Sequence, residues 1–414
     1  MDVKTKETNK VSNWCVVSMA SIPLVMTLGN SMLIPVLPIF EKKVGISSFQ
    51  TSMIITSYSI ASIFLIPIAG YLSDRYGRKI VILPSLIFAL IGGLIAGYAS
   101  WKINEPFTWI IIGRVLQGIG AAGAAPIILP LVGDLYKDDD EKTSSCLGII
   151  ETSNTFGKVL SPILGAAFAA FLWYLPFFSI SFFSLISILL VIFFIKIPKK
   201  KEEPPALKEF MKNTKKIFKH EGKWIFTIFV IGIFVMYVLF AVLFFLSDIL
   251  EKTHNLYGVK KGFVLSIPLL ALCFSSFITG RKIKGDLKMM RKIMLVSLTA
   301  IALSVSFVGF VNDRLIILLA VTSFLGLAIG SLLPTLDAII TENIEKEERG
   351  TISSFYSSSR FIGVAAGPPL MSIFMRDFLN GSFIVAGIIS FAVAALVYFF
   401  IKTEEKPRLK EATV

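Results

Sequence analysis

Long apolar runs separated by short polar loops dominate the pattern of this chain. A helix needs about 20 mainly apolar residues to cross a bilayer, and twelve runs meet that length. They cover residues 13–40, 49–72, 79–100, 107–136, 143–171, 173–197, 224–250, 262–280, 292–311, 315–341, 350–374 and 382–401. The pattern therefore predicts an all-α membrane protein with 12 transmembrane helices.

The composition supports a protein whose solvent is lipid. Of the 414 residues, 55% are hydrophobic and only 17% are charged, whereas roughly a quarter of a soluble domain is charged. A net charge of +13 would suggest a nucleic-acid partner in a soluble protein, but here the basic residues lie in short loops, so we expect none. The three cysteines lack the spacing of metal ligands, so no metal site is expected.

The distribution of basic residues between alternate loops predicts the orientation. Of the 41 Lys and Arg residues, 30 fall on the side that carries both termini, eight on the other side and three within spans. Cytoplasmic loops carry the excess of Lys and Arg. We therefore expect a multi-pass protein of the cell membrane with both termini in the cytoplasm.

A charge-rich segment divides the chain into two similar halves. Residues 198–223 form the predicted cytoplasmic linker between two six-helix bundles, residues 1–197 and 224–414. Gly118 and Pro126 recur 208 positions later as Gly326 and Pro334. This repetition predicts two pseudo-symmetric bundles around a central cavity, with the substrate site where the repeats meet.

The loop between the second and third spans carries a specific motif. Its key positions are Gly70, Asp74, Arg75, Gly77, Arg78 and Lys79. The loop resembles the signature loop of the major facilitator superfamily, Gly-x-x-x-Asp-Arg-x-Gly-Arg-Lys, and matches every key position. The resemblance implies a gating role for these residues where the spans reach the cytoplasmic surface.

Three further segments resemble the twelve-span drug–proton antiporter branch of that superfamily. Arg114 opens a segment similar to the fourth-helix motif Arg-x-x-Gln-Gly, and Asn30 opens a similar stretch of the first span. The fifth and eleventh spans carry a glycine–proline block that allows a helix to bend. Its residues are Gly157, Pro162 and Gly165 in the fifth span, and Gly363, Gly367 and Pro368 in the eleventh. Ser161 stands where the antiporter motif has glycine.

Charged residues inside spans are the candidates for transport chemistry, because burying them in a membrane is costly. Glu151, Asp337 and Asp134 are the predicted proton-coupling carboxylates, since a carboxyl group that is buried holds its proton more tightly. Lys158 and Arg360 are predicted cationic anchors for an anionic or zwitterionic substrate. The alternative interpretation is that each of these charges forms a structural salt bridge between helices, for example Glu151 with Arg360 across the two halves.

Several other residues are predicted to bind substrate. Arg114 either faces the cavity or extends to the membrane surface. Asn30, Tyr58, Tyr237 and Tyr356 are assigned to the substrate site; the tyrosines suit a flat ligand or simply pack against their neighbours.

These features together predict a proton-coupled exporter of a small molecule, working by alternating access as a monomer without a cofactor. The alternatives within the superfamily are export of an anionic or zwitterionic metabolite such as a siderophore, glycolipid flipping, and uptake. A membrane-embedded enzyme would need a cluster of nucleophile and base or of metal ligands, and a channel would need a filter-like repeat. The sequence shows neither.

Overall fold

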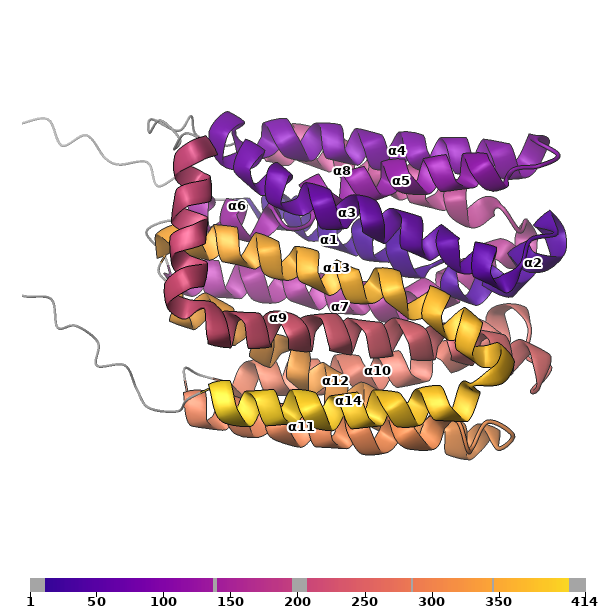
Figure 1. Ribbon diagram of the computed structural model, residues 1–414. Helices are drawn as coiled ribbons and strands as arrows, with labels where there is room; N and C mark the ends of the chain where they lie inside the picture. The colour runs from indigo at the N-terminus through magenta and orange to yellow at the C-terminus, as the bar shows by residue number, and fades with distance from the viewer. Residues whose placement is uncertain (1–11, 137–139, 196–206, 284–285, 345, 402–414) are drawn as a thin grey trace, which may run out of the picture.

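The computed structural model describes residues 12–136, 140–195, 207–283, 286–344 and 346–401, and their regular secondary structure is helical throughout (Figure 1). The helices are α1 (Asn13–Ser31), η1 (Ile34–Val36), α2 (Leu37–Val44), α3 (Ser48–Tyr76), α4 (Arg78–Lys102), α5 (Phe107–Ala124), α6 (Ile128–Leu135), α7 (Asp140–Phe171), α8 (Leu175–Phe194), α9 (Leu207–Lys252), α10 (Gly258–Lys282), α11 (Leu287–Val308), α12 (Leu315–Asn343), α13 (Lys346–Asp377) and α14 (Leu379–Phe400).

These helices make twelve crossings, which confirms the predicted count. Helices α1, η1 and α2 together form the first crossing, α5 and α6 together form the fourth, and every other helix makes one. Ten crossings are long and apolar enough to span a membrane by composition alone. The other two are α7 and α13, of 32 residues each. Both carry predicted charged residues within the crossing, Glu151 and Lys158 in α7 and Arg360 in α13.

Two crossings predicted as continuous helices are broken in the structure. The span expected over residues 13–40 is interrupted after Ser31 by the 3-10 turn η1, which contains Pro35. The span expected over residues 107–136 is interrupted beside Pro126. Proline has no backbone N–H and its ring clashes with the preceding turn, so it breaks a helix interior.

The segment predicted as a linker is partly helical. The backbone of α9 begins at Leu207 and continues without interruption through the seventh crossing to Lys252, and in Figure 1 its first turns lie across one end of the bundle. Residues 196–206 lie outside the described part. The predicted boundaries of the two halves, 1–197 and 224–414, stay predictions.

The two halves of the chain pack together through two pairs of helices. Helix α3 packs on α13, and α7 packs on α10. The Thr56 hydroxyl donates to the Ala365 carbonyl at 2.8 Å, and the Ser266 hydroxyl donates to the Val159 carbonyl at 2.9 Å. These bonds join the halves at buried points along the middle of the bundle.

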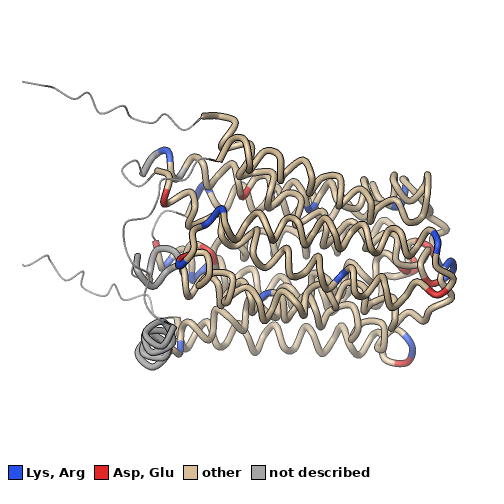
Figure 2. The backbone as a smooth tube through the Cα atoms, turned by 90° about the horizontal axis from the view of Figure 1, so that it is seen from above, with Lys and Arg blue, Asp and Glu red and all other residues tan. Residues whose placement is uncertain are grey.

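The charged residues of the bundle gather at its two ends, with few between them (Figure 2). We call the end where α3 meets α4 at Gly77 the motif end, and the end where α2 meets α3 at Gly45 the far end. Large apolar side chains, including Phe64, Phe193 and Phe399, are more than half exposed on the outside of the bundle. Such a surface suits a protein surrounded by lipid.

Candidate substrate cavity

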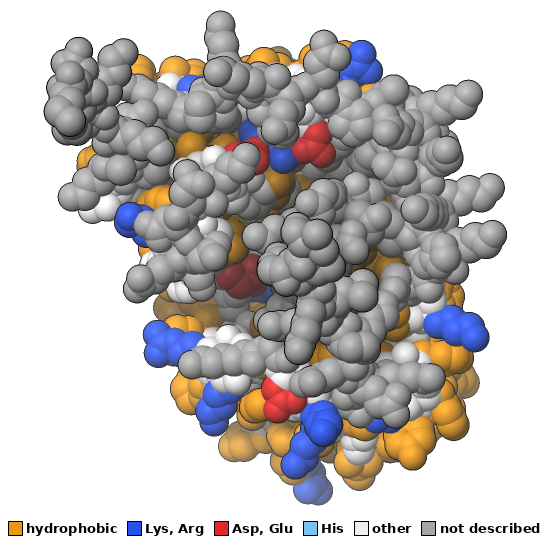
Figure 3. Space-filling view, turned by 90° about the vertical axis from the view of Figure 1, so that its left-hand side faces the viewer, with side chains coloured by type: hydrophobic (Ala, Val, Ile, Leu, Met, Phe, Trp, Pro, Cys, Tyr) orange, Lys and Arg blue, Asp and Glu red, His pale blue; other side chains and the backbone are white. Residues whose placement is uncertain are grey.

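A cavity of about 400 Å³ lies between the two halves, at the breaks in the first and fourth crossings. Helices α1, α3, α5, α6, α7, α9, α10, α12 and α13 contribute to its lining, together with η1. The lining reaches Ile340, three residues from the end of α12 at the motif end. Figure 3 looks onto the motif end and shows a hollow there with an acidic side chain inside it. The cavity is therefore open toward the motif end.

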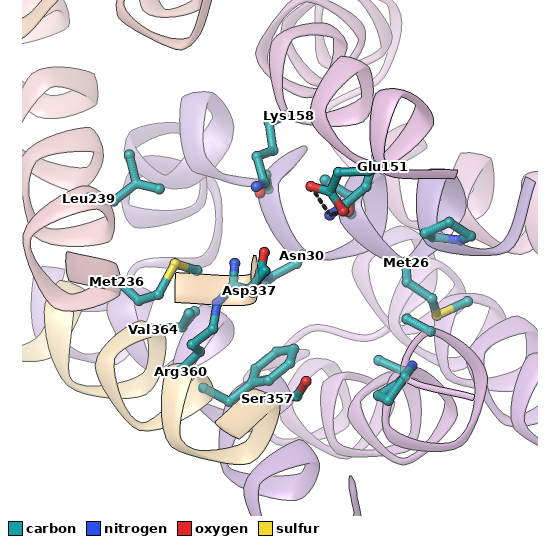
Figure 4. A pocket seen from close by; sticks show the side chains of 18 of the residues that line it. Met26, Asn30, Glu151, Lys158, Met236, Leu239, Asp337, Ser357, Arg360 and Val364 are labelled. Atoms are coloured by element: carbon teal, nitrogen blue, oxygen red, sulfur yellow. Dashed lines mark hydrogen bonds and ion pairs between the residues drawn. The ribbon is translucent and has the colours of Figure 1, made fainter. Parts of the chain in front are cut away.

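Helix α7 places a carboxylate and an ammonium group on the cavity wall. Glu151 and Lys158 both line the cavity (Figure 4), as their spacing of two helical turns predicts. The amide nitrogen of Asn154 donates to the two Glu151 oxygens at 3.3 and 3.4 Å. The Thr27 hydroxyl on α1 donates to the Asn154 Oδ1 at 2.6 Å. This bond fixes which side of the amide faces Glu151.

The C-terminal half supplies a second carboxylate and a second cation. The Nη1 of Arg360 on α13 lies 3.4 Å from the Oδ1 of Asp337 on α12, and both residues line the cavity. The Arg360 guanidinium also lies over the Tyr356 ring, 5.5 Å from its centroid. An interhelical salt bridge of the kind expected in the alternative interpretation thus forms, but Arg360 pairs with Asp337 of its own half and the example of Glu151 with Arg360 is wrong.

Arg114, predicted to bind substrate, lies outside the cavity lining, next to the lining residue Tyr58, and is fully buried. Its guanidinium donates to the backbone carbonyls of Ile54 and Gly29, both at 2.8 Å, and to the Gln117 side chain at 2.6 Å. It also lies 4.6 Å from the centroid of the Tyr58 ring. The expectation that Arg114 extends to the membrane surface is therefore wrong. The structure instead assigns it to holding α1, α3 and α5 together.

The remaining predicted substrate and proton residues separate into two groups. Asn30, Tyr58 and Tyr356 line the cavity, and the Tyr58 hydroxyl donates to the Met26 carbonyl at 3.1 Å. Tyr237 lies outside the lining. Asp134 also lies outside it, because it pairs with Arg78 at the motif end. Of the three predicted proton-coupling carboxylates, the cavity brings together Glu151 and Asp337.

Comparison with known proteins identifies the family. The model of the Major Facilitator Superfamily matches residues 19–290 and 262–414. The chain belongs to this superfamily. It is 52% identical over 95% of its length, and 98% of the relative's, to a protein named Bacillibactin exporter from Bacillus subtilis (strain 168). It is 25% identical over 87% of its length, and 89% of the relative's, to Multidrug resistance protein 2 of the same organism.

Solved structures agree on the fold. A D-xylose-proton symporter superposes with a TM-score of 0.77 at 13% identity, over 94% of this chain and 98% of the other. The human organic anion transporter MFSD10 superposes with a TM-score of 0.72 at 16% identity, over 93% and 99%. The family match and the 52% identical relative make the protein a multi-pass transporter of the bacterial cell membrane, and not an enzyme.

The superfamily signature loop forms a charge cluster at the motif end. Arg78 lies 2.6 Å from Asp74 and 3.0 Å from Asp134 on α6, and it also donates to the Ser73 hydroxyl at 2.7 Å. Gly77 turns the chain between α3 and α4 with φ of 104°, a conformation that L side chains rarely adopt. The loop therefore ties α3, α4 and α6 together within the N-terminal half.

Three other residues of the loop lie outside that cluster. Lys79 donates to the carbonyls of Ile192 and Ile195 at 3.0 and 2.7 Å, which caps the end of α8. Arg75 donates to the Tyr71 hydroxyl at 3.0 Å on the exposed surface. Gly70 faces Ser354 of α13, so the loop's first residue lies against the opposite half.

The glycines of the two glycine–proline blocks allow close contacts between helices. A Cβ added at Gly165 would lie 1.9 Å from the Met32 carbonyl at the break in the first crossing. A Cβ added at Gly363 would lie 2.0 Å from the Ile233 carbonyl of α9. Both distances are far below van der Waals contact. The two blocks thus set the approach of α7 to α1 and of α13 to α9.

An ion cluster at the far end was missed at the level of sequence. Glu251 accepts from Lys42 of the N-terminal half at 2.7 Å and from Lys261 of α10 at 3.0 Å. Beside it the Ser247 hydroxyl donates to the Ile34 carbonyl at 2.8 Å, which also joins the halves. The sequence predicts a loop between the spans at 224–250 and 262–280, because charged residues lower the local hydropathy. Glu251 and Lys261 both fall in that predicted loop, and the sequence gives no signal that they are buried.

Proposed function

We propose that this protein exports a siderophore across the cell membrane by alternating access, in exchange for protons. The observation that carries the proposal is the 52% identity to Bacillibactin exporter, which extends over 95% of this chain. Relatives named as multidrug proteins match at 24 to 27%.

The cavity has the chemistry to hold an iron-chelating molecule without its metal. Ferric iron is a hard ion that favours oxygen ligands, so its chelators present oxygens as hydroxyl groups or oxyanions. An oxyanion accepts hydrogen bonds from Lys158 and Arg360, which line the cavity from opposite halves. Apolar residues, including Met26 and Met236, supply much of the wall (Figure 4).

Glu151 is the proposed proton-coupling group. Its side chain is exposed to the cavity, and Asn154 and Thr155 hold its carboxylate in place. A substrate hydroxyl donates more strongly to this group while it is an ionised carboxylate, because a charge-assisted hydrogen bond is stronger than a neutral one. A proton bound there leaves only a neutral, weaker acceptor, so proton and substrate compete for one group. Such competition is the condition for antiport, and Asp337 is the second candidate for the same role.

The predicted orientation puts the motif end in the cytoplasm. A cavity open toward that end takes substrate from the cytoplasm, and the closed far end is then the exit. Release requires the halves to separate at the far end, where Lys42 and Glu251 join them.

Multidrug export is the second candidate function, favoured by the 25% identity to Multidrug resistance protein 2 and by the methionines of the wall, which adapt to varied ligands. The described lining of the cavity offers no net negative charge that would favour lipophilic cations as the main substrates, because Lys158 and Arg360 balance Glu151 and Asp337.

Complementation in Bacillus subtilis tests the proposal. In a strain that lacks its bacillibactin exporter, this chain should restore the siderophore in the medium and lower its content in the cells under iron starvation. Empty vector and the Lys158→Gln variant, each matched for the amount of protein in the membrane, are the controls. If the wild-type chain reaches the membrane, leaves secretion unrestored and instead protects against lipophilic cationic drugs, multidrug export replaces the proposal.

A further inference from the structure

The ion pair inside the cavity is longer than the ion pairs at the two ends of the protein. Arg360 Nη1 and Asp337 Oδ1 lie 3.4 Å apart, whereas the pairs of Arg78 and Glu251 measure 2.6 to 3.0 Å. A charge-assisted hydrogen bond between nitrogen and oxygen is typically about 2.7–2.9 Å long. The cavity pair is therefore a loose contact.

The surroundings of this pair leave room for a third group. The Asp337 side chain is 41% accessible and that of Arg360 is 19% accessible, although both lie deep between the helices, because the cavity reaches them. A guanidinium has five N–H donors, so Arg360 keeps donors to spare. The other charged groups that line the cavity are Glu151 and Lys158 of α7.

The four cavity charges sum to zero in the empty state, with two cations and two carboxylates. An unpaired guanidinium at this depth would be costly, since a desolvated charge needs a partner. Asp337 meets that need while no substrate is present. An anionic substrate that binds Arg360 meets the same need and makes Asp337 redundant.

We propose that Asp337 is an exchangeable counter-ion whose place at Arg360 is taken by an anionic oxygen of the substrate. The inference rests on the proposed export function and names the chemistry of one subsite. Asp337 competes with the substrate and so lowers its affinity. The competition also drives release, because the carboxylate returns to Arg360 as the oxyanion departs.

The charge-neutral variant Asp337→Asn distinguishes an exchangeable counter-ion from a purely structural residue. It keeps the shape of the side chain and removes the competing charge, so anions should bind up to roughly fivefold more tightly, the range expected when a partly exposed ion pair no longer has to be broken. A neutral ligand should bind as before. In transport, KM and kcat for the siderophore should both fall, because tighter binding slows release.

The test uses the purified full-length protein and titration calorimetry. The probes are metal-free bacillibactin, salicylate as a small hydroxyl-bearing anion, and salicylamide as its neutral analogue. Asp313→Asn is the matched control, since it removes the same charge from an exposed far-end loop. Asp337→Glu keeps the competing charge and should bind anions as the wild type does.

Two results overturn the inference. One is that Asp337→Asn binds salicylate no more tightly than the wild type while its melting temperature is unchanged. The other is that Asp337→Asn and Asp337→Glu weaken binding of anion and neutral analogue alike, which marks a purely structural role. If bacillibactin does not bind to the wild type but Asp337→Asn tightens salicylate binding, the siderophore proposal fails. The role of Asp337 as an exchangeable counter-ion of Arg360 then still holds.

Discussion

Removing the carboxylate of Glu251 should destabilise the protein far more than removing the lysine that bridges to it from the other half. Glu251 and Lys261 have only 4% and 1% of their surface exposed, whereas the Lys42 side chain is 66% exposed. Glu251→Gln leaves the buried Lys261 ammonium without its counter-charge. Lys42→Ala leaves Glu251 still paired with Lys261.

The exposed fractions of these side chains determine how much stability each substitution should cost. Breaking a buried ion pair by removing one partner costs about 3–5 kcal/mol, which applies to Glu251→Gln. A pair with one exposed partner is worth about 0–1 kcal/mol after solvent screening, which applies to Lys42→Ala. The double variant Glu251→Gln with Lys261→Met removes both buried charges and should return most of the lost stability, because no unpaired charge remains.

The assay is thermal unfolding of the purified protein in detergent, scanned at one rate for all variants. The expected order of apparent melting temperature is wild type, then Lys42→Ala close below it, then the double variant, with Glu251→Gln lowest. Equal losses for Lys42→Ala and Glu251→Gln, or a double variant as unstable as Glu251→Gln, would refute the reasoning, because neither fits a buried pair with an exposed third member.

Three further predictions concern the cavity and the helix contacts. Glu151→Gln should abolish siderophore flux driven by a pH gradient in proteoliposomes while leaving downhill exchange; full gradient-driven flux would pass the coupling role to Asp337. Asp74→Ala should abolish transport without lowering the amount of protein in the membrane, as judged by flux and immunoblot of the same cells, and wild-type flux would remove the gating role of the motif. Gly165→Ala should lower the apparent melting temperature, since its Cβ would lie 1.9 Å from the Met32 carbonyl; an unchanged value would show that α7 and α1 separate freely.

The sequence was sufficient for the number of crossings and for the charges of the cavity. Hydrophobic runs of membrane length predict each helix, because lipid leaves the backbone no other partner than itself. Glu151, Lys158, Asp337 and Arg360 stood out since a charge in a span is costly. All four line one cavity.

The pairing of those charges could not be predicted. Arg360 could reach either carboxylate by depth alone, and only the packing of α12 beside α13 selects Asp337. The position of Arg114 depends on carbonyls of α1 and α3 that the helix breaks and contacts bring to it. The Thr27–Asn154 bond gives no sequence signal, because the two residues are 127 positions apart and both are common in loops and helices.

Transport by the purified protein most directly tests the central claim, that the protein moves a siderophore in exchange for protons. Wild-type protein in proteoliposomes with an acidic lumen is given metal-free bacillibactin outside, and the amount inside is followed over time. If siderophore and protons are exchanged, bacillibactin should accumulate in the lumen above its outside concentration, and a proton ionophore should abolish this accumulation. Bacillibactin uptake no faster than in protein-free vesicles, by protein that retains its fold, would contradict it.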